Sequence, residues 1–173
     1  MKAKRFFLVI AMVFAMQQAF TQQTPDKWAK WNYLIGEWVG EGNGQPGKGS
    51  GSFSLSFDLD GKILVRKNHA EYPETKEKEA FVHTDLMFIY PDNSDNISKA
   101  IYFDNEGHII NYLITYAENS ITLTSEAIPN GPRFRFTYIM IDNDTINVKF
   151  EIAQPNNTEA FKTYIEGKCF RKK

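Results

Sequence analysis

Residues 34–44 read Leu34-Ile35-Gly36-Glu37-Trp38-Val39-Gly40-Glu41-Gly42-Asn43-Gly44, and this stretch decides the fold. It joins a short tryptophan-rich segment to the first of about ten strand-like segments. The glycine at position 36 allows a sharp backbone turn, and the floor of a barrel can bury the large ring of Trp38. The Gly-x-Trp at the start of the first strand therefore predicts a closed antiparallel β-barrel that is plugged at one end.

The segment just before this stretch, residues 26–34, is predicted to be a short helix. Trp28, Trp31 and Leu34 recur at three-residue steps and form one apolar stripe, and Asp26 is placed to cap the first turn. An apolar stripe needs a hydrophobic surface to cover. We therefore expect this N-terminal helix to be the plug of the barrel.

The rest of the chain alternates between apolar and polar residues with a period of two. In residues 52–59 the odd positions from Phe53 to Leu59 are apolar, which is typical of a half-buried strand, and Asp60-Gly61 is a strong hairpin signal. Turn-forming sequences separate further predicted strands at residues 62–72, 83–90, 99–104, 108–117, 120–126, 133–141, 145–153 and 159–170. Strands at this spacing, with no helical period between them, predict an all-β up-and-down barrel.

The first 21 residues are predicted to be a cleavable signal peptide. Lys2, Lys4 and Arg5 precede an apolar run over residues 6–16 that is too short to span a bilayer, and Ala19 and Thr21 suit a cleavage site. Residues 22–173 then form one secreted or periplasmic barrel domain with no transmembrane segment. The alternative is an N-terminus that is retained as an amphipathic anchor.

The composition excludes some classes of partner. Without residues 1–21 the chain has 17 basic and 21 acidic residues, a net charge of about −4. Such a surface does not attract polyanions, so nucleic acid is not an expected partner. The lone cysteine, Cys169, excludes an internal disulfide and a cysteine-based zinc site.

Three hairpin turns predict which side chains lie inside the barrel, because directly opposed residues point to the same side of a sheet. A two-residue turn at Asp60-Gly61 pairs Leu55 with Arg66 and Phe53 with Asn68, so both polar residues share the apolar face. The turns at residues 105–107 and 118–119 place a further set on the interior face: Tyr102, Asp104, His108, Ile110, Tyr112, Ile114 and Ser125.

The turn at residues 142–144 is predicted to be a two- or four-residue loop, which pairs Arg135 with Ile152. On that register Arg133 and Arg135 point inward. Three aromatic rings then point outward: Phe134, Phe136 and Tyr138. Outward rings favour one alternative function, an envelope interaction module that binds another protein through its outer wall.

The predicted interior arginines indicate a binding site at the unplugged end. An isolated buried charge costs on the order of several kcal/mol, so Asp85, Asp104, Glu126 or a bound anion must pair with the arginines. We expect a small amphipathic, anionic ligand such as a fatty acid. The candidate ligand-binding residues are Arg66, Asn68, His83, Asp85, Tyr102, Asp104, His108, Tyr112, Arg133 and Arg135, of which His83 and Asp85 have no assigned face.

No catalytic residue and no metal site is expected. A cluster of His69, His83 and His108 would suit a metal, but the register places His69 outside, opposite Ser52. An Asp104–His108 pair is explained by a turn-stabilising contact as well as by general acid–base catalysis. The serines lack a nucleophile elbow. An enzyme on this barrel remains the alternative to a carrier.

The Gly36-x-Trp38 motif after a short helix, followed by a ten-strand meander, resembles the calycin superfamily of lipocalins and fatty-acid-binding proteins. Residues 34–42 are similar to the start of the nitrobindin-like haem-binding barrels, and residues 63–69, 83–87 and 102–108 resemble a group of bacterial secreted barrels. The resemblance covers nearly all of residues 22–173. It implies that Trp38 stacks under an arginine from the chain's end, for which Arg171 is the match. Gly36, Trp38 and Arg171 are therefore structural candidates.

The chain departs from the nitrobindin-like pattern in one respect. Those barrels use a histidine close to the C-terminus as haem ligand, whereas residues 164–173 contain no histidine. A haem ligand would have to be His69, His83 or His108, so haem is not carried over as a cofactor. A nitrobindin-like haem isomerase remains an alternative to simple ligand carriage.

Overall fold

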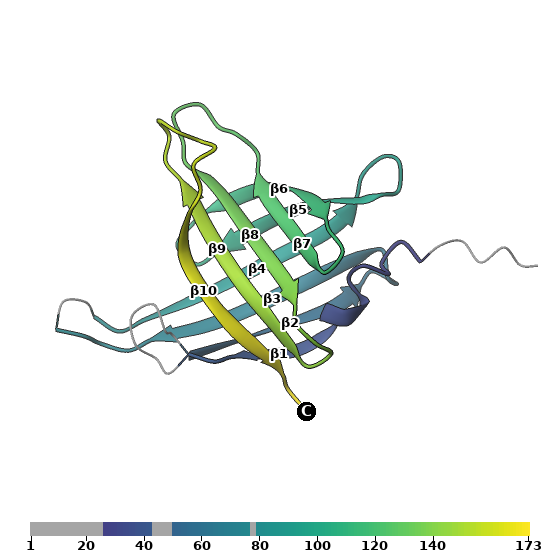
Figure 1. Ribbon diagram of the computed structural model, residues 1–173, viewed down its shortest axis with the longest axis horizontal. Helices are drawn as coiled ribbons and strands as arrows, with labels where there is room; N and C mark the ends of the chain where they lie inside the picture. Colours follow the sequence, from purple (N-terminus) through teal and green to yellow (C-terminus); the bar gives the residue numbers. More distant parts are fainter. Residues whose placement is uncertain (1–25, 43–49, 77–78) are drawn as a thin grey trace, which may run out of the picture.

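Ten antiparallel strands close into one barrel in a computed structural model, which describes residues 26–42, 50–76 and 79–173 (Figure 1). Strands adjacent in sequence pair with each other, and β1 pairs with β10 to close the barrel. The predicted all-β barrel is confirmed, while the predicted signal peptide lies outside the described residues. The strands are β1 (Gly36–Gly40), β2 (Ser50–Asp58), β3 (Ile63–Tyr72), β4 (Phe81–Pro91), β5 (Ile97–Asp104), β6 (Ile109–Tyr116), β7 (Ser120–Ser125), β8 (Arg133–Met140), β9 (Thr145–Ala153) and β10 (Lys162–Arg171).

The helix predicted for residues 26–34 is not confirmed. Within the described ranges the one helical element is a 3-10 turn, η1 (Asn32–Leu34), and tight turns precede it. Most of the backbone bonds here join residues three apart, as from the N–H of Trp31 to the carbonyl of Trp28 at 2.7 Å. So short a segment is a marginal α-helix by itself, and Gly36, with φ at +121°, ends it abruptly.

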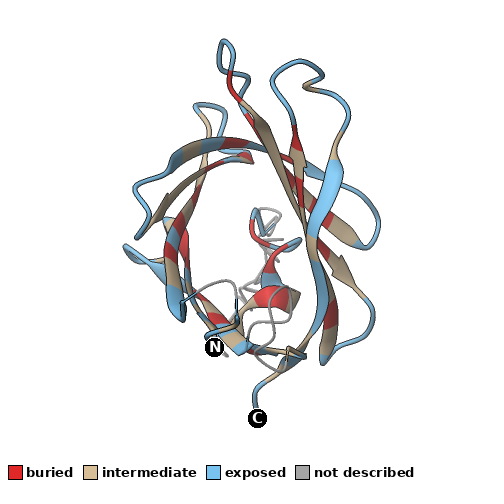
Figure 2. Cartoon of the chain, turned by 90° about the vertical axis from the view of Figure 1, so that its left-hand side faces the viewer, coloured by how far each residue is buried: buried red, intermediate tan, exposed pale blue. Residues whose placement is uncertain are grey.

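The apolar stripe of this segment is buried as the sequence predicts. Trp31 and Leu34 have no exposed surface. The indole N–H of Trp28 donates to the carbonyl of Gly61 at 3.1 Å, and that of Trp31 donates to the Tyr116 hydroxyl at 2.9 Å. The segment therefore packs against the β2–β3 and β6–β7 turns, at the end of the barrel that is farther from the viewer in Figure 2.

Trp38 and Arg171 tie the start of the barrel to its end. The Arg171 guanidinium lies 4.4 Å from the Trp38 ring centre, as the resemblance implies. It donates to the carbonyls of Ile35 at 2.8 Å and Tyr33 at 2.5 Å, while the Trp38 indole donates to the carbonyl of Leu34 at 2.9 Å. The β1–β10 junction and the N-terminal segment are thus held by one set of contacts.

Replacing Gly36 by alanine is expected to destabilise the fold by about 1–3 kcal/mol, because its φ of +121° disfavours a side chain. A Cβ there would also lie 3.2 Å from Arg171 Nη1. Gly167→Ala in β10 is the matched control, since nothing lies within 4 Å of a Cβ at that position. Urea unfolding of both variants measures the difference, and equal midpoints would contradict the strain at position 36.

Three of the predicted hairpin registers are confirmed. Leu55 pairs with Arg66 between β2 and β3, as Tyr112 does with Ser125 between β6 and β7. Between β5 and β6 the three-residue loop ends at Gly107, whose φ is +91°. The side chains predicted to be inside from these three turns therefore share the interior face.

The predicted register between β8 and β9 is wrong. The Asp142 to Asp144 turn is a three-residue loop, closed by the N–H of Ile141 donating to the carbonyl of Thr145 at 3.1 Å. Arg135 consequently pairs with Glu151. A shift of one residue moves every side chain to the other face. The two sets exchange places: Arg133 and Arg135 point outward, and Phe134, Phe136 and Tyr138 point inward.

The interior divides along the barrel axis. A packed core fills the half next to η1, where Leu34, Trp38, Leu64, Ile89 and Leu123 are fully buried. Toward the β3–β4 and β5–β6 turns the inward side chains are only partly buried. The other half of the barrel is therefore available for a site.

Candidate functional site

A cavity of about 1070 Å³ occupies the half of the barrel away from η1. Eight of the ten residues predicted to bind ligand line it, and Arg133 and Arg135 do not. One side of the lining is polar and the other is apolar. The predicted residues that line the cavity are Arg66, Asn68, His83, Asp85, Tyr102, Asp104, His108 and Tyr112.

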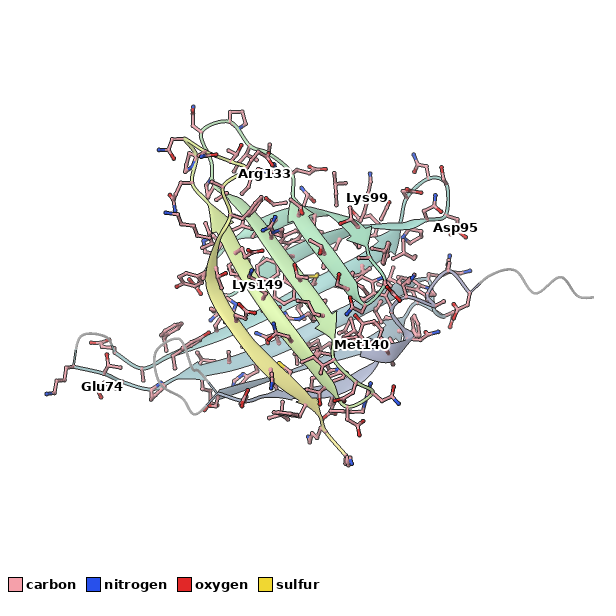
Figure 3. The ribbon with its side chains drawn as sticks, in the orientation of Figure 1. Glu74, Asp95, Lys99, Arg133, Met140 and Lys149 are labelled. Carbon is pink, nitrogen blue, oxygen red and sulfur yellow. The ribbon has the colours of Figure 1, made fainter. Side chains whose placement is uncertain are left out.

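Arg133 and Arg135 belong to a charged network on the outer wall. Arg133 forms an ion pair with Glu159, and Arg135 Nε donates to Glu151 Oε2 at 2.6 Å. Lys149 Nζ lies 3.0 Å from the same carboxylate. Figure 3 marks Arg133 and Lys149 on the wall formed by β8 and β9. These arginines therefore stabilise the outer wall through ion pairs, and neither of them lines the cavity.

Arg66 and Asp85 form a buried ion pair on the polar side of the cavity. Their side chains are 6% and 4% exposed, and Arg66 Nη1 donates to Asp85 Oδ1. Burial alone would raise the pKa of Asp85, but the Arg66 charge and the His83 hydrogen bond lower it below its usual value. The pair therefore stays ionised inside the barrel, with one charge of each sign.

The Arg66 guanidinium is also enclosed by aromatic rings. Its central carbon lies 5.1 Å from the Phe53 ring centre and 5.3 Å from that of Phe136. Its Nε is buried and has no hydrogen-bond partner among the described residues. Two rings and one carboxylate thus fix this side chain where the packed core meets the cavity.

His83 connects the ion pair to the mouth of the cavity. Its Nε2 lies 3.4 Å from Asp85 Oδ2 and 3.0 Å from the Tyr102 hydroxyl, while Nδ1 lies 2.7 Å from Glu106 Oε1. The hydrogen bond with Asp85 raises the pKa of His83, against the effect of its partial burial. The two residues left unassigned from sequence, His83 and Asp85, therefore both face inward.

Asp104 organises the β5–β6 turn at the same mouth. Its Oδ1 accepts the backbone N–H groups of Glu106 at 3.0 Å and His108 at 2.9 Å. Its Oδ2 lies 2.8 Å from His108 Nδ1 and accepts from the Tyr102 hydroxyl at 3.2 Å. These bonds match the turn-stabilising interpretation of the Asp104–His108 pair.

The apolar side of the cavity is an aromatic wall that sequence reasoning missed. The rings of Phe134 and Phe150 stack with centres 5.9 Å apart, and Phe136 and Tyr164 contact Phe150 at 6.3 and 6.2 Å. These rings are partly exposed because they line the cavity. A signal was present in the sequence, since the even positions from Phe134 to Met140 are all apolar or aromatic.

The ionisable groups that line the cavity are mostly acidic. One guanidinium faces the cavity, that of Arg66, and three carboxylates do, those of Asp85, Asp104 and Glu106; His83 and His108 also line it. Glu166 and Lys168 border it only through β10, because they pair with the outward residues Lys149 and Asn147 of β9. The charges concentrate at the mouth, while the aromatic wall carries none. An anion entering the cavity would therefore pass several like charges.

Haem fits this cavity poorly. Of the three histidines only His83 and His108 line it, and both lie at the mouth beside Asp104 and Glu106. An iron held there would bring the haem propionates next to carboxylates of like charge.

Comparisons with known proteins were made at the level of families and of curated sequences. The chain matches no protein-family model, and a search of curated proteins finds no match. Within the described ranges, no helical segment has the length and hydropathy needed to cross a bilayer. The cavity and its residues are therefore the basis for assigning a function.

Proposed function

We propose that this barrel binds a small amphipathic molecule in its cavity and acts as a secreted or periplasmic carrier of the calycin kind. The observation that carries the proposal is a cavity of about 1070 Å³ with a polar side, an aromatic side and a closed floor. Cavities of about 300–1000 Å³ commonly hold small ligands, so this volume suffices for a long-chain molecule.

The two sides of the cavity suggest how the ligand is oriented. Its apolar part lies against the wall of Phe134, Phe136 and Phe150, where burial of about 100 Å² of apolar surface contributes roughly 2–3 kcal/mol. Its polar group lies near Arg66 and Asp85, the most deeply buried charged residues of the lining. Tyr112, buried on the same side, adds a hydroxyl.

The chemistry of the ion pair favours an uncharged polar group over a carboxylate. Arg66 is already neutralised by Asp85, and the two arginines expected to assist it are on the outer wall. A paired guanidinium and carboxylate offer donors and acceptors at one place, which suits an alcohol or an amide. A fatty acid anion would bring a third charge beside Asp85.

Two further features support this assignment over the alternatives. The closed ten-strand meander and the stacking of Arg171 on Trp38 agree with the resemblance to calycins. The outer-wall interaction module loses its basis, because Phe134, Phe136 and Tyr138 point into the barrel. The predicted signal peptide is the basis for the proposed export.

Filling the cavity is expected to weaken binding without unfolding the barrel. Ile110 lines the cavity and Ile109, its neighbour in β6, is 65% exposed. Ile110→Trp should weaken the binding of a fluorescent long-chain amphipathic probe by about tenfold or more, equivalent to about 1.4 kcal/mol. Ile109→Trp adds the same ring on the other face and should leave affinity unchanged. Equal affinity for both variants would overturn the proposal.

The same titration identifies the preferred polar group. Displacement of the probe by an alcohol, an amide and a carboxylate of equal chain length gives the order of affinity. We expect the alcohol or the amide to bind more tightly than the carboxylate. Mass spectrometry of molecules extracted from the purified protein gives an independent identification.

A further inference from the structure

We propose that His83, Asp104 and Glu106 form a binding site for a divalent first-row transition-metal ion at the mouth of the cavity. One ligand atom from each of the three side chains lies within 4.8 Å of the others. An imidazole nitrogen with two carboxylate oxygens suits Zn²⁺ and its neighbours, whereas Mg²⁺ and Ca²⁺ prefer oxygen ligands alone. This site is independent of the amphipathic ligand proposed above.

The position of His83 is the first argument for the site. A metal-bound histidine commonly donates its other ring N–H to a carboxylate, which fixes the ring. Asp85 Oδ2 lies 3.4 Å from His83 Nε2, and Arg66 in turn holds Asp85 in place. Nδ1 is then turned toward Glu106 Oε1, 2.7 Å away, on the side where a metal would bind.

Asp104 is preorganised in a similar way. Its side chain is 4% exposed, and two backbone N–H groups hold Oδ1 at 2.9 and 3.0 Å. Oδ2 is therefore fixed in direction and faces the Tyr102 hydroxyl, which also contacts His83 Nε2 at 3.0 Å. A metal at Oδ2 would replace its hydrogen bonds with His108 Nδ1, 2.8 Å away, and with the Tyr102 hydroxyl, while the two backbone N–H groups keep Oδ1 in place.

Glu106 completes the set from the β5–β6 turn. Its side chain is 51% exposed, so it can move by the fraction of an ångström that exchanges a hydrogen bond for a metal bond. His108 contacts Asp104 from the outer side and is 57% exposed. Three protein ligands leave a fourth position open to water or to a molecule in the cavity.

The competing explanation is a hydrogen-bonded cluster that stabilises the turn and binds no metal. A matched control for it exists on the outer wall. His69 Nε2 lies 3.0 Å from Glu71 Oε1, a histidine–carboxylate contact without a second carboxylate and without a buried acid behind the ring. Zn²⁺ titration of variants at the two sites distinguishes a preorganised metal site from an ordinary histidine–carboxylate contact.

The test is calorimetric titration of ZnCl₂ into the tag-free mature chain after treatment with EDTA and dialysis. We expect one equivalent of Zn²⁺ per chain. Glu106→Gln and His83→Ala should each weaken binding by about tenfold or more, since even residues behind the ligands contribute 10–100-fold. His69→Ala should bind as the wild type does.

Two outcomes would overturn the proposal. One is the absence of stoichiometric binding by the wild-type chain. The other is an equal affinity of Glu106→Gln and the wild type, with circular dichroism as the check that this substitution at an exposed position leaves the fold intact. Visible absorption of the Co²⁺-loaded chain gives a second readout. Probe binding measured in EDTA tests the carrier function separately, so either proposal can fail alone.

Discussion

Trp38→Ala is expected to lower the free energy of unfolding by about 3–5 kcal/mol, the range for a large aromatic side chain removed from a core. Trp38 is fully buried and stacks on Phe53, with ring centres 6.3 Å apart. The substitution removes both this contact and the surface on which Arg171 lies. Urea denaturation followed by circular dichroism measures the loss.

Trp38→Phe is the matched control for this prediction. It keeps an aromatic ring but loses the indole hydrogen bond to the carbonyl of Leu34. A buried carbonyl without its donor costs about 1–3 kcal/mol, so we expect a smaller loss than for alanine. If both variants unfolded at the wild-type midpoint, the ring would not be part of the barrel floor.

Asp85→Ala should destabilise the barrel by a similar amount, about 3–5 kcal/mol, because it leaves the buried charge of Arg66 without a partner. Both side chains of the pair are at most 6% exposed, so water in the cavity compensates for little of the lost carboxylate. Chemical denaturation at neutral pH measures this loss.

Two comparisons separate this effect from a general loss of charge. Glu37 pairs with Lys172 at 2.8 Å, but both are more than half exposed, and Glu37→Ala should cost at most about 1 kcal/mol. Replacing Arg66 and Asp85 together by leucine removes the unpaired charge and should restore much of the stability. A double variant less stable than Asp85→Ala would contradict the assignment of the loss to Arg66.

The fold was predictable because local patterns decide it. Period-two alternation and the turn sequences at Asp60-Gly61 and Asn105 to Gly107 are short-range signals, and the structure confirms the registers drawn from them. The predicted helix before Gly36 differs because three-residue steps of Trp28, Trp31 and Leu34 suit 3-10 turns as well as an α-helix. The sequence therefore predicted that the apolar stripe is buried, but it did not predict which type of helix the segment forms.

The site was only half predictable, because it depends on the number of residues in one loop. Residues 141–145 support a two-, three- or four-residue loop equally well by composition, and the three-residue form reverses the face of Arg135. The apolar series Phe134, Phe136, Tyr138 was the better guide to the interior. Glu106 was missed because its position at the mouth results from the β5–β6 turn.

The pairing of β1 with β10 has a consequence for how the chain is made. The partner of Trp38 is Arg171, so the barrel cannot close until β10 has been synthesised. Contacts between residues so distant in sequence form late and slowly. Until then β1 and β10 are two unpaired sheet edges of the nascent chain, the kind of edge on which non-native pairing begins.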